Sequence, residues 1–150
     1  MAFTSLGVIS DTHNGESNLQ VAADMFRKYA VDVVLHCGDV TDSSCLSYLS
    51  DFDLKIVCGN NDSLLELSPV VASMGGVILQ QPVCFEWNGR HILATHGHGT
   101  GASVAESAYE SGEWDLVCSG HTHRFELREG GKTTYLNPGS LLNGDFCIVT

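Results

Sequence analysis

The chain has 150 residues, of which 43% are hydrophobic and 17% charged, so we expect one globular domain over residues 1–150 rather than a disordered segment. The formal net charge is −11 with only seven Lys and Arg residues, which argues against a general nucleic-acid binder, because affinity for phosphate backbones comes from clustered basic side chains. No apolar run reaches the roughly 18 residues of a membrane span and residues 1–10 do not form a basic, apolar leader, so we expect a cytoplasmic protein without a membrane partner.

The first third of the chain predicts alternating strands and helices. A strand over Ser5–Ser10 precedes a helix over Asn18–Tyr29, whose apolar residues recur at helical spacing. A strand over Asp32–Cys37, a short helix over Ser43–Leu49 and a strand over Leu54–Cys58 follow. This βαβαβ order predicts a parallel sheet with right-handed crossovers.

The middle of the chain predicts a change to antiparallel pairing. Strands are expected over Val77–Leu79, Val83–Trp87 and Arg90–Ala94. Asn88-Gly89, between the last two strands, is the strongest two-residue signal for a β-hairpin. A helix is then expected over Ala102–Ser111.

The last third of the chain predicts further strands. One is expected over Leu116–Ser119, and Phe125–Arg128 and Thr133–Leu136 form a predicted hairpin. Asn137-Pro138-Gly139 has the signature of a type II turn, and Phe146–Val149 could close a sheet. Two packed sheets flanked by helices fit this order of elements.

Five short polar motifs each follow an apolar run that predicts a buried strand. They are Asp11-Thr12-His13, Gly38-Asp39, Gly59-Asn60-Asn61-Asp62, His96-Gly97-His98 and Gly120-His121-Thr122-His123. In open α/β sheets, ligands bind outside the carboxyl ends of the strands, so these motifs should converge at one edge. They supply two carboxylates, an amide oxygen and four imidazoles, which are ligands that can hold a pair of divalent transition metals.

Two simpler explanations of these residues are weaker. An Asp after a strand is a common helix cap, and Asp11 and Asp39 could be caps. This explanation requires that five polar motifs follow five strands, in this order, by coincidence. A closed structural zinc site would favour four ligands rich in Cys. The six cysteines contain no C-x-x-C pair, and we expect them to be buried free thiols, although three lie close to the motifs: Cys37, Cys58 and Cys118.

Other polar residues near the motifs are expected to play supporting roles. His36 is interpreted as a packed residue behind the ligands, and His91 as a structural or exposed residue of a hairpin strand. Asp62 is expected to hold the Asn60 loop by hydrogen bonds. Two interpretations of His98 have equal weight: it is either a substrate contact or an ordinary loop histidine.

These motifs, together with Asn137-Pro138-Gly139-Ser140, resemble the calcineurin-like metallophosphoesterase superfamily, in particular its small bacterial and archaeal phosphodiesterase branch. The resemblance spans nearly the whole chain and implies a four-layer αββα sandwich, in which two mixed β-sheets are flanked by helices. It also implies hydrolysis of a small phosphate ester by a hydroxide that bridges two divalent metals. Mn²⁺ is favoured by the ligand types, and Fe, Ni, Co or Zn are chemically acceptable.

The resemblance also assigns the ligands. One metal would be held by Asp11, His13, Asp39 and His123, and the other by Asp39, Asn60, His96 and His121. Asp39 would bridge the two, because a shared carboxylate helps to hold metals about 3.5 to 4 Å apart. Asp39 and Asn60 are therefore expected to serve catalysis as well as metal binding.

One position departs from the family pattern. Most members carry a His after the ligand Asn, commonly assigned to protonating the leaving oxygen, whereas this chain has Asn61. An Asn cannot act as a general acid, so another donor such as His98 or a metal-bound water would have to serve.

Two other functions are weighed against a phosphodiesterase. One is a non-catalytic interaction module, as in the retromer subunit that shares this fold with an impaired metal site, and the intact ligand set argues against it. The other is a nuclease of the same superfamily, which the shortage of basic residues disfavours. The sequence leaves self-association as a homo-oligomer open.

Overall fold

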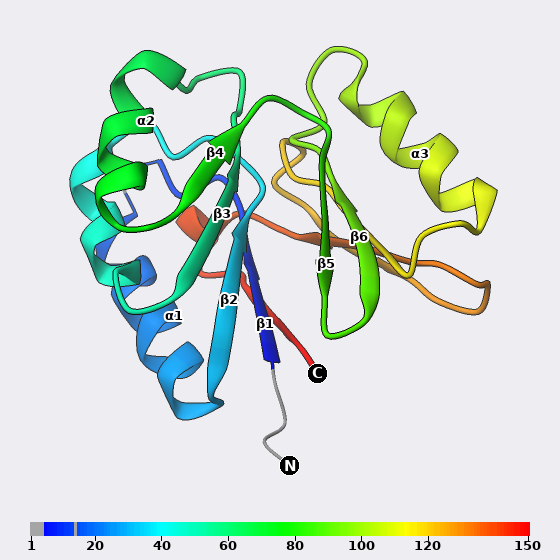
Figure 1. Ribbon diagram of the computed structural model, residues 1–150, viewed down its shortest axis with the longest axis horizontal. Coiled ribbons are helices and arrows are strands. Elements are labelled where there is room, and N and C mark those ends of the chain that lie inside the picture. Colours follow the sequence, from blue (N-terminus) through cyan, green and yellow to red (C-terminus); the bar gives the residue numbers. More distant parts are fainter. Residues whose placement is uncertain (1–4, 14) are drawn as a thin grey trace.

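The computed structural model describes residues 5–13 and 15–150, and its strands form two five-stranded sheets that face each other (Figure 1). The first sheet has the order β10-β1-β2-β3-β4. Four of its strands are parallel and the fifth, β10, runs antiparallel to β1. The βαβαβ pattern predicts the parallel pairing of β1, β2 and β3, whereas β4 joins them through a crossover helix over Leu64–Ser73 that the sequence analysis does not predict. Their bounds are β1 Ser5–Ile9, β2 Val31–His36, β3 Asp53–Val57, β4 Val77–Leu79 and β10 Cys147–Val149.

The second sheet has the order β5-β6-β7-β9-β8 and mixes both kinds of pairing. The β5–β6 and β8–β9 pairs are antiparallel, whereas β7 runs parallel to both of its neighbours. Asn88 and Gly89 both have positive φ, 51° and 76°, which is the conformation that a two-residue type I′ hairpin requires. The strands are β5 Val83–Trp87, β6 Arg90–Ala94, β7 Leu116–Cys118, β8 Phe125–Arg128 and β9 Thr134–Pro138.

Helices cover the outer face of each sheet, which confirms the four-layer αββα sandwich (Figure 1). Apolar clusters fill all three gaps between the layers, because each sheet is apolar on both faces. Helices α1 (Glu16–Lys28) and α2 (Leu64–Ser73) pack on the first sheet, and α3 (Gly101–Ser111) packs on the second. Short 3₁₀ helices span Ser43–Leu49 and Leu141–Asn143.

Helix α2 is the one regular helix of the described chain to which the sequence analysis assigned nothing. Pro69 lies inside it, and a proline removes a helical hydrogen bond, so the segment has a poor helical pattern. A local signal was nevertheless present, because Ser63 caps the helix by accepting the Glu66 N–H at 3.3 Å. Among the described residues, no helix has the length and apolar character to cross a membrane.

Candidate metal centre

The polar motifs that follow β1, β2, β3, β6 and β7 come together at one end of the sandwich. Two sets of side chains are close enough to share an ion. We call Asp11, His13 and His123 the Asp11 group, and Asp39, Asn60, His96 and His121 the His96 group.

The carboxylate of Asp11 is buried and only half of it is hydrogen-bonded. Its Oδ2 accepts from the Ser10 hydroxyl at 2.6 Å and from the His121 N–H at 3.0 Å. Its Oδ1 accepts nothing from the described residues and lies 3.4 Å from Nε2 of His123. A buried, unpaired carboxylate oxygen is costly, so this atom fits a cation held together with His13 and His123.

In the His96 group, several ligand atoms converge on Nε2 of His96. The Nδ1 of this ring lies 2.7 Å from the Cys37 carbonyl, and we place its proton there, which leaves a lone pair on Nε2. That Nε2 lies 3.0 Å from Asn60 Oδ1, 3.3 Å from His121 Nδ1 and 3.4 Å from Asp39 Oδ2. Because facing lone pairs repel, the arrangement fits a cation that accepts all of them.

Asp39 lies between the two groups. Its Oδ2 is 3.4 Å from Nε2 of His96 and 4.0 Å from Nε2 of His13. Burial disfavours the charged carboxylate, but a hydrogen bond from His96, whose ring can be protonated when no metal is bound, and the hydrogen bonds from Asn61 outweigh it and hold the pKa of Asp39 below its usual range. The carboxylate is therefore ionised at neutral pH, as a bridging ligand must be.

The backbone at the candidate ligands is unusual. Five of them have positive φ, between 43° and 70°: Asp11, His13, Asp39, His121 and His123. This left-handed conformation is uncommon for residues other than glycine, and it persists only where surrounding contacts impose it. Nor does either Asp cap a described helix: α1 begins after Gly15 without a side-chain cap, and the 3₁₀ helix at Ser43 is capped by Asp42.

Two glycines let the motifs approach one another closely. A Cβ at Gly59 would overlap the Asp39 carboxylate, and a Cβ at Gly120 would overlap the Ser10 side chain next to Asp11. Only glycine fits such approaches without displacing a ligand loop.

Asp62 and His36 hold the loops behind the ligands, as expected from the sequence. Asp62 accepts from the N–H groups of Asp39 at 2.8 Å, Gly59 at 2.9 Å and Thr41 at 2.9 Å. Burial lowers the pKa of His36 to about 4, so its ring is neutral. It accepts from the Gly38 N–H at 3.0 Å.

The Asn137-Pro138-Gly139-Ser140 segment also supports the ligand loops. The Asn137 amide donates to the Gly120 carbonyl and the Thr122 hydroxyl, both at 3.1 Å. The Ser140 hydroxyl donates to the Asp11 carbonyl at 3.0 Å. Asn137 and Pro138 belong to β9, and the chain turns at Gly139, where φ is 82°.

His98 and Asn61 both lie at the His96 group. The ring of His98 is centred 5.4 Å from that of His96 and 6.4 Å from that of His121. Its Nδ1 is buried without a hydrogen-bond partner among the described residues, and burial together with the neighbouring imidazoles lowers its pKa. Asn61 donates twice to Asp39, from its backbone N–H and from its side-chain amide, each at 3.0 Å.

The remaining predicted residues lie away from the ligand atoms. His91 is exposed on β6, as expected. Neither set of candidate ligands among the described residues includes a cysteine, and burial raises the pKa values of the Cys37 and Cys118 thiols. All six cysteines are free, but the expectation that they are buried fails at Cys84, which is exposed on the edge strand β5, and at Cys147, which is half-buried.

Gln81 is a supporting residue that the sequence analysis missed. Its Oε1 accepts from the N–H groups of His96 at 3.0 Å and Gly97 at 3.2 Å, and its Nε2 donates to the His98 carbonyl at 2.9 Å. One side chain thus holds the loop that carries both histidines. A single glutamine before a strand belongs to no sequence motif that would predict hydrogen bonds to a distant loop.

Replacing Gln81 by Ala should weaken the binding of a divalent metal ion at the His96 group by about 10- to 100-fold, with Mn²⁺ as the probe, because residues that orient metal ligands contribute on that scale. The measurement is Mn²⁺ titration by isothermal calorimetry, with His91→Ala as the matched surface control. Unchanged Mn²⁺ affinity in folded Gln81→Ala protein would show that the loop keeps its shape without this side chain.

Comparisons with known proteins agree with this geometry. The family model of the calcineurin-like phosphoesterase superfamily domain matches residues 5–146. A phosphodiesterase of Methanocaldococcus jannaschii is 30% identical over 138 residues, which cover 89% of this chain and 82% of that protein. A solved structure of an archaeal phosphodiesterase superimposes with a TM-score of 0.81 at 29% identity, covering 91% of this chain and 84% of that one. Vps29 of Chaetomium thermophilum shares the fold, with a TM-score of 0.68 at 22% identity over 97% of this chain and 79% of that one.

Proposed function

This chain belongs to the calcineurin-like phosphoesterase superfamily, and on that premise we propose that it is a phosphodiesterase that hydrolyses a small phosphate ester with two divalent metal ions. The observation that carries the proposal is the placement of Asp39, whose Oδ2 adjoins Nε2 of His96 at 3.4 Å and Nε2 of His13 at 4.0 Å. One carboxylate thus borders both the Asp11 group and the His96 group, as a bridging ligand requires.

The Asp11 group and the His96 group would each hold one divalent ion, and such ions, when bound, would supply a hydroxide nucleophile and charge stabilisation at the phosphoryl oxygens. The residues of this chain would orient the ligands for that chemistry. Asn61 donates two hydrogen bonds that orient the Asp39 carboxylate. Asn60 contributes a neutral oxygen, which limits negative charge where an anionic phosphate must bind.

We assign a substrate contact to His98. Its Nδ1 is buried, has no hydrogen-bond partner among the described residues and belongs to a ring that lies against the His96 group. A hydrogen bond to an ester oxygen would satisfy this atom. With Asn at position 61, His98 is the side chain that we place beside the leaving group.

Mn²⁺ is the ion we favour, because a set of carboxylate, amide and imidazole ligands suits it, and Fe, Ni, Co or Zn would also be accepted. The complete ligand set supports an enzyme over a non-catalytic interaction module. The charge distribution disfavours a nuclease, because three of the seven basic residues are paired with carboxylates: Arg27, Lys55 and Arg128.

Metal-free protein should bind two Mn²⁺ ions per chain and become more stable. An ion at 100 times its dissociation constant stabilises the folded state by about 2.7 kcal/mol. Two such sites should raise the melting temperature by roughly 10 to 20 °C in a chain of this length. Elemental analysis after desalting gives the stoichiometry, and hydrolysis of phosphomonoesters, phosphodiesters and cyclic nucleotides gives the activity.

Each possible result separates one part of the proposal from another. Fewer than one ion per chain, with no metal-dependent rise in melting temperature, would defeat the assignment of both groups. Two bound ions without hydrolysis of any of these esters would favour the interaction module instead. Metal-dependent hydrolysis of monoesters alone would show that the substrate is a monoester rather than a diester, and would leave the assignment of the metal centre unchanged.

A further inference from the structure

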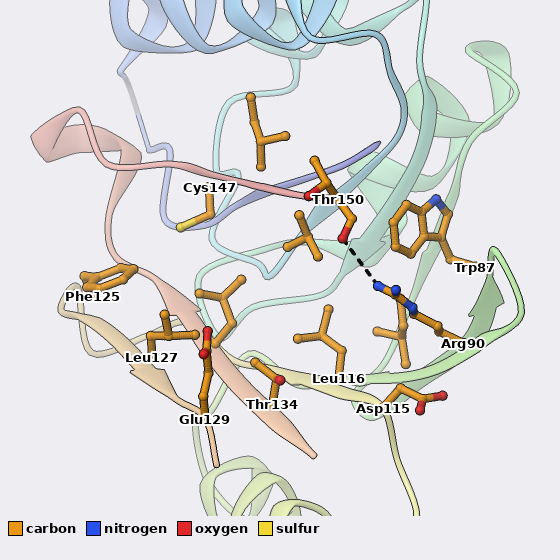
Figure 2. Close-up of a pocket in the computed structure, with 14 residues that line it drawn as sticks. Trp87, Arg90, Asp115, Leu116, Phe125, Leu127, Glu129, Thr134, Cys147 and Thr150 are labelled. Carbon is orange, nitrogen blue, oxygen red and sulfur yellow. Dashed lines mark hydrogen bonds between the residues drawn. The ribbon is translucent and has the colours of Figure 1, made fainter. Parts of the chain in front are cut away.

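Within residues 5–13 and 15–150, the second sheet has a free edge at β8, which is paired with β9 on one side only. Two large apolar side chains of this strand are exposed, Phe125 by 57% and Leu127 by 46%. Together with Glu129 they line a cavity of about 460 Å³ between the two sheets. Figure 2 shows these three side chains in a row, with Cys147 of β10 across from them. An exposed edge with apolar side chains is a natural site for pairing with another strand.

The hydrogen bonds of β9 show which backbone groups of β8 are free. The Leu136 carbonyl accepts from the Ser119 N–H at 3.1 Å, so the backbone groups of Leu136 are directed toward β7. Leu136 stands opposite Leu127 in the antiparallel β8–β9 ladder. A pair whose groups point away from each other is a non-hydrogen-bonded pair, so the N–H and C=O of Leu127 point to the free edge. Because the pattern repeats every two residues, those of Phe125 point there too.

The other face of β8 carries opposite charges. Arg128 donates from Nε to Glu126 at 2.6 Å and from Nη1 to Glu106 of α3 at 2.8 Å. Its guanidinium also lies over the ring of Tyr135, 4.3 Å from the ring centre. Along the strand, an acidic and a basic residue therefore flank Leu127 symmetrically.

We propose that two copies of this chain associate through antiparallel pairing of β8 with β8, on a two-fold axis at Leu127. In this register, Leu127 faces Leu127 of the second copy, and their free N–H and C=O groups form hydrogen bonds with each other. Glu126 of each copy faces Arg128 of the other. Opposite charges at facing positions stabilise a strand pair, whereas like charges weaken it.

Neighbouring registers that keep the backbone hydrogen bonds are less favourable. A two-fold axis at Glu126 would place Glu126 against Glu126, and an axis at Arg128 would place Arg128 against Arg128. Only the axis at Leu127 pairs both charges correctly. This axis also places Leu127 against Leu127 at the mouth of the cavity, with Phe125 of each copy opposite Glu129 of the other. This association is independent of the proposed activity.

A pair of reversed charges tests the register. Glu126→Arg places Arg against Arg128 of the second copy, and Arg128→Glu places Glu against Glu126. Each variant alone should dimerise roughly tenfold more weakly, or worse, because the unfavourable pair occurs twice. An equimolar mixture should restore the dimer, since the Arg-bearing strand then faces the Glu-bearing strand. Sedimentation velocity over a range of concentrations measures all four samples.

Two further variants keep the result interpretable. Arg128→Glu also removes the ion pair with Glu106, so Leu127→Lys, which places two lysines together on the axis, provides a second way to break the dimer. Glu86→Arg makes the same charge reversal on β5, the other edge of this sheet, and should leave the dimer intact. Circular dichroism verifies that each variant is folded.

A wild-type protein that stays monomeric at every concentration would overturn the proposal. So would a dimer that survives Leu127→Lys, because another surface would then hold it. A mixture of folded Glu126→Arg and Arg128→Glu proteins that stays monomeric would overturn the assigned register.

Discussion

Asp39→Asn is expected to lower phosphodiester hydrolysis by about 10³-fold, more than any other single substitution of a candidate ligand. The amide removes the negative charge that borders both groups of ligands. A metal ion contributes several kcal/mol of transition-state stabilisation, and each loss of about 1.4 kcal/mol costs a factor of ten in rate. The measurement is kcat/KM for an activated aryl phosphodiester at saturating Mn²⁺, together with the number of ions that remain bound.

Two comparisons isolate the bridging role of Asp39. Asp11→Asn changes a residue of the Asp11 group whose Oδ1 lies 4.0 Å from Nε2 of His96, farther than the 3.4 Å of Asp39 Oδ2, so it should cost less activity and leave about one tightly bound ion. His91→Ala, at the exposed start of the hairpin strand β6, should behave like the wild type. Comparable losses in folded Asp39→Asn and His91→Ala proteins would show that the bridge is wrongly assigned.

The wild-type enzyme is expected to hydrolyse activated aryl phosphodiesters much faster than alkyl phosphodiesters, and Asn61→His should narrow the difference. Without a proton donor at position 61, the barrier depends on how well the leaving oxygen carries negative charge. A well-placed general acid contributes on the order of 10² to 10⁴ in rate, and it helps poor leaving groups most. The measurement is the slope of log kcat/KM against leaving-group pKa for a series of substituted phenyl phosphodiesters.

Asn61→Ala is the matched control for this experiment. Both substitutions remove the amide that donates to Asp39 at 3.0 Å, but only His adds an imidazole. A flatter slope with His and not with Ala would therefore identify proton donation as the cause. A wild-type slope already near zero, with chemistry rate-limiting, would mean that another residue such as His98 supplies the proton.

The strands and the polar loops that follow them could be predicted from the sequence because both signals are local. An apolar run that ends at Asp11, Asp39 or His96 shows a buried strand and a polar residue at its carboxyl end within a few positions. The Asn88-Gly89 hairpin could be predicted for the same reason, since positive φ at two successive residues is a property of the residues themselves.

Helix α2 and Gln81 show where local signals are insufficient. Pro69 weakens the helical pattern of α2, and packing of its apolar face on the first sheet compensates for it. Gln81 acts through hydrogen bonds to a loop that begins 15 residues later, and nothing in the neighbouring sequence indicates that partner. The parallel pairing of β7 with both β6 and β9 likewise depends on which strands become neighbours.

The sequence by itself determined which residue types are available as ligands and their order along the chain. Only the tertiary structure decided how they are grouped, because that depends on distances between loops far apart in the chain. The His121 N–H reaches the Asp11 carboxylate across 110 residues, and Asp39 comes to lie between His13 and His96. The tertiary structure also decided that β8 has a free edge, since an edge is defined by the strand that is missing beside it.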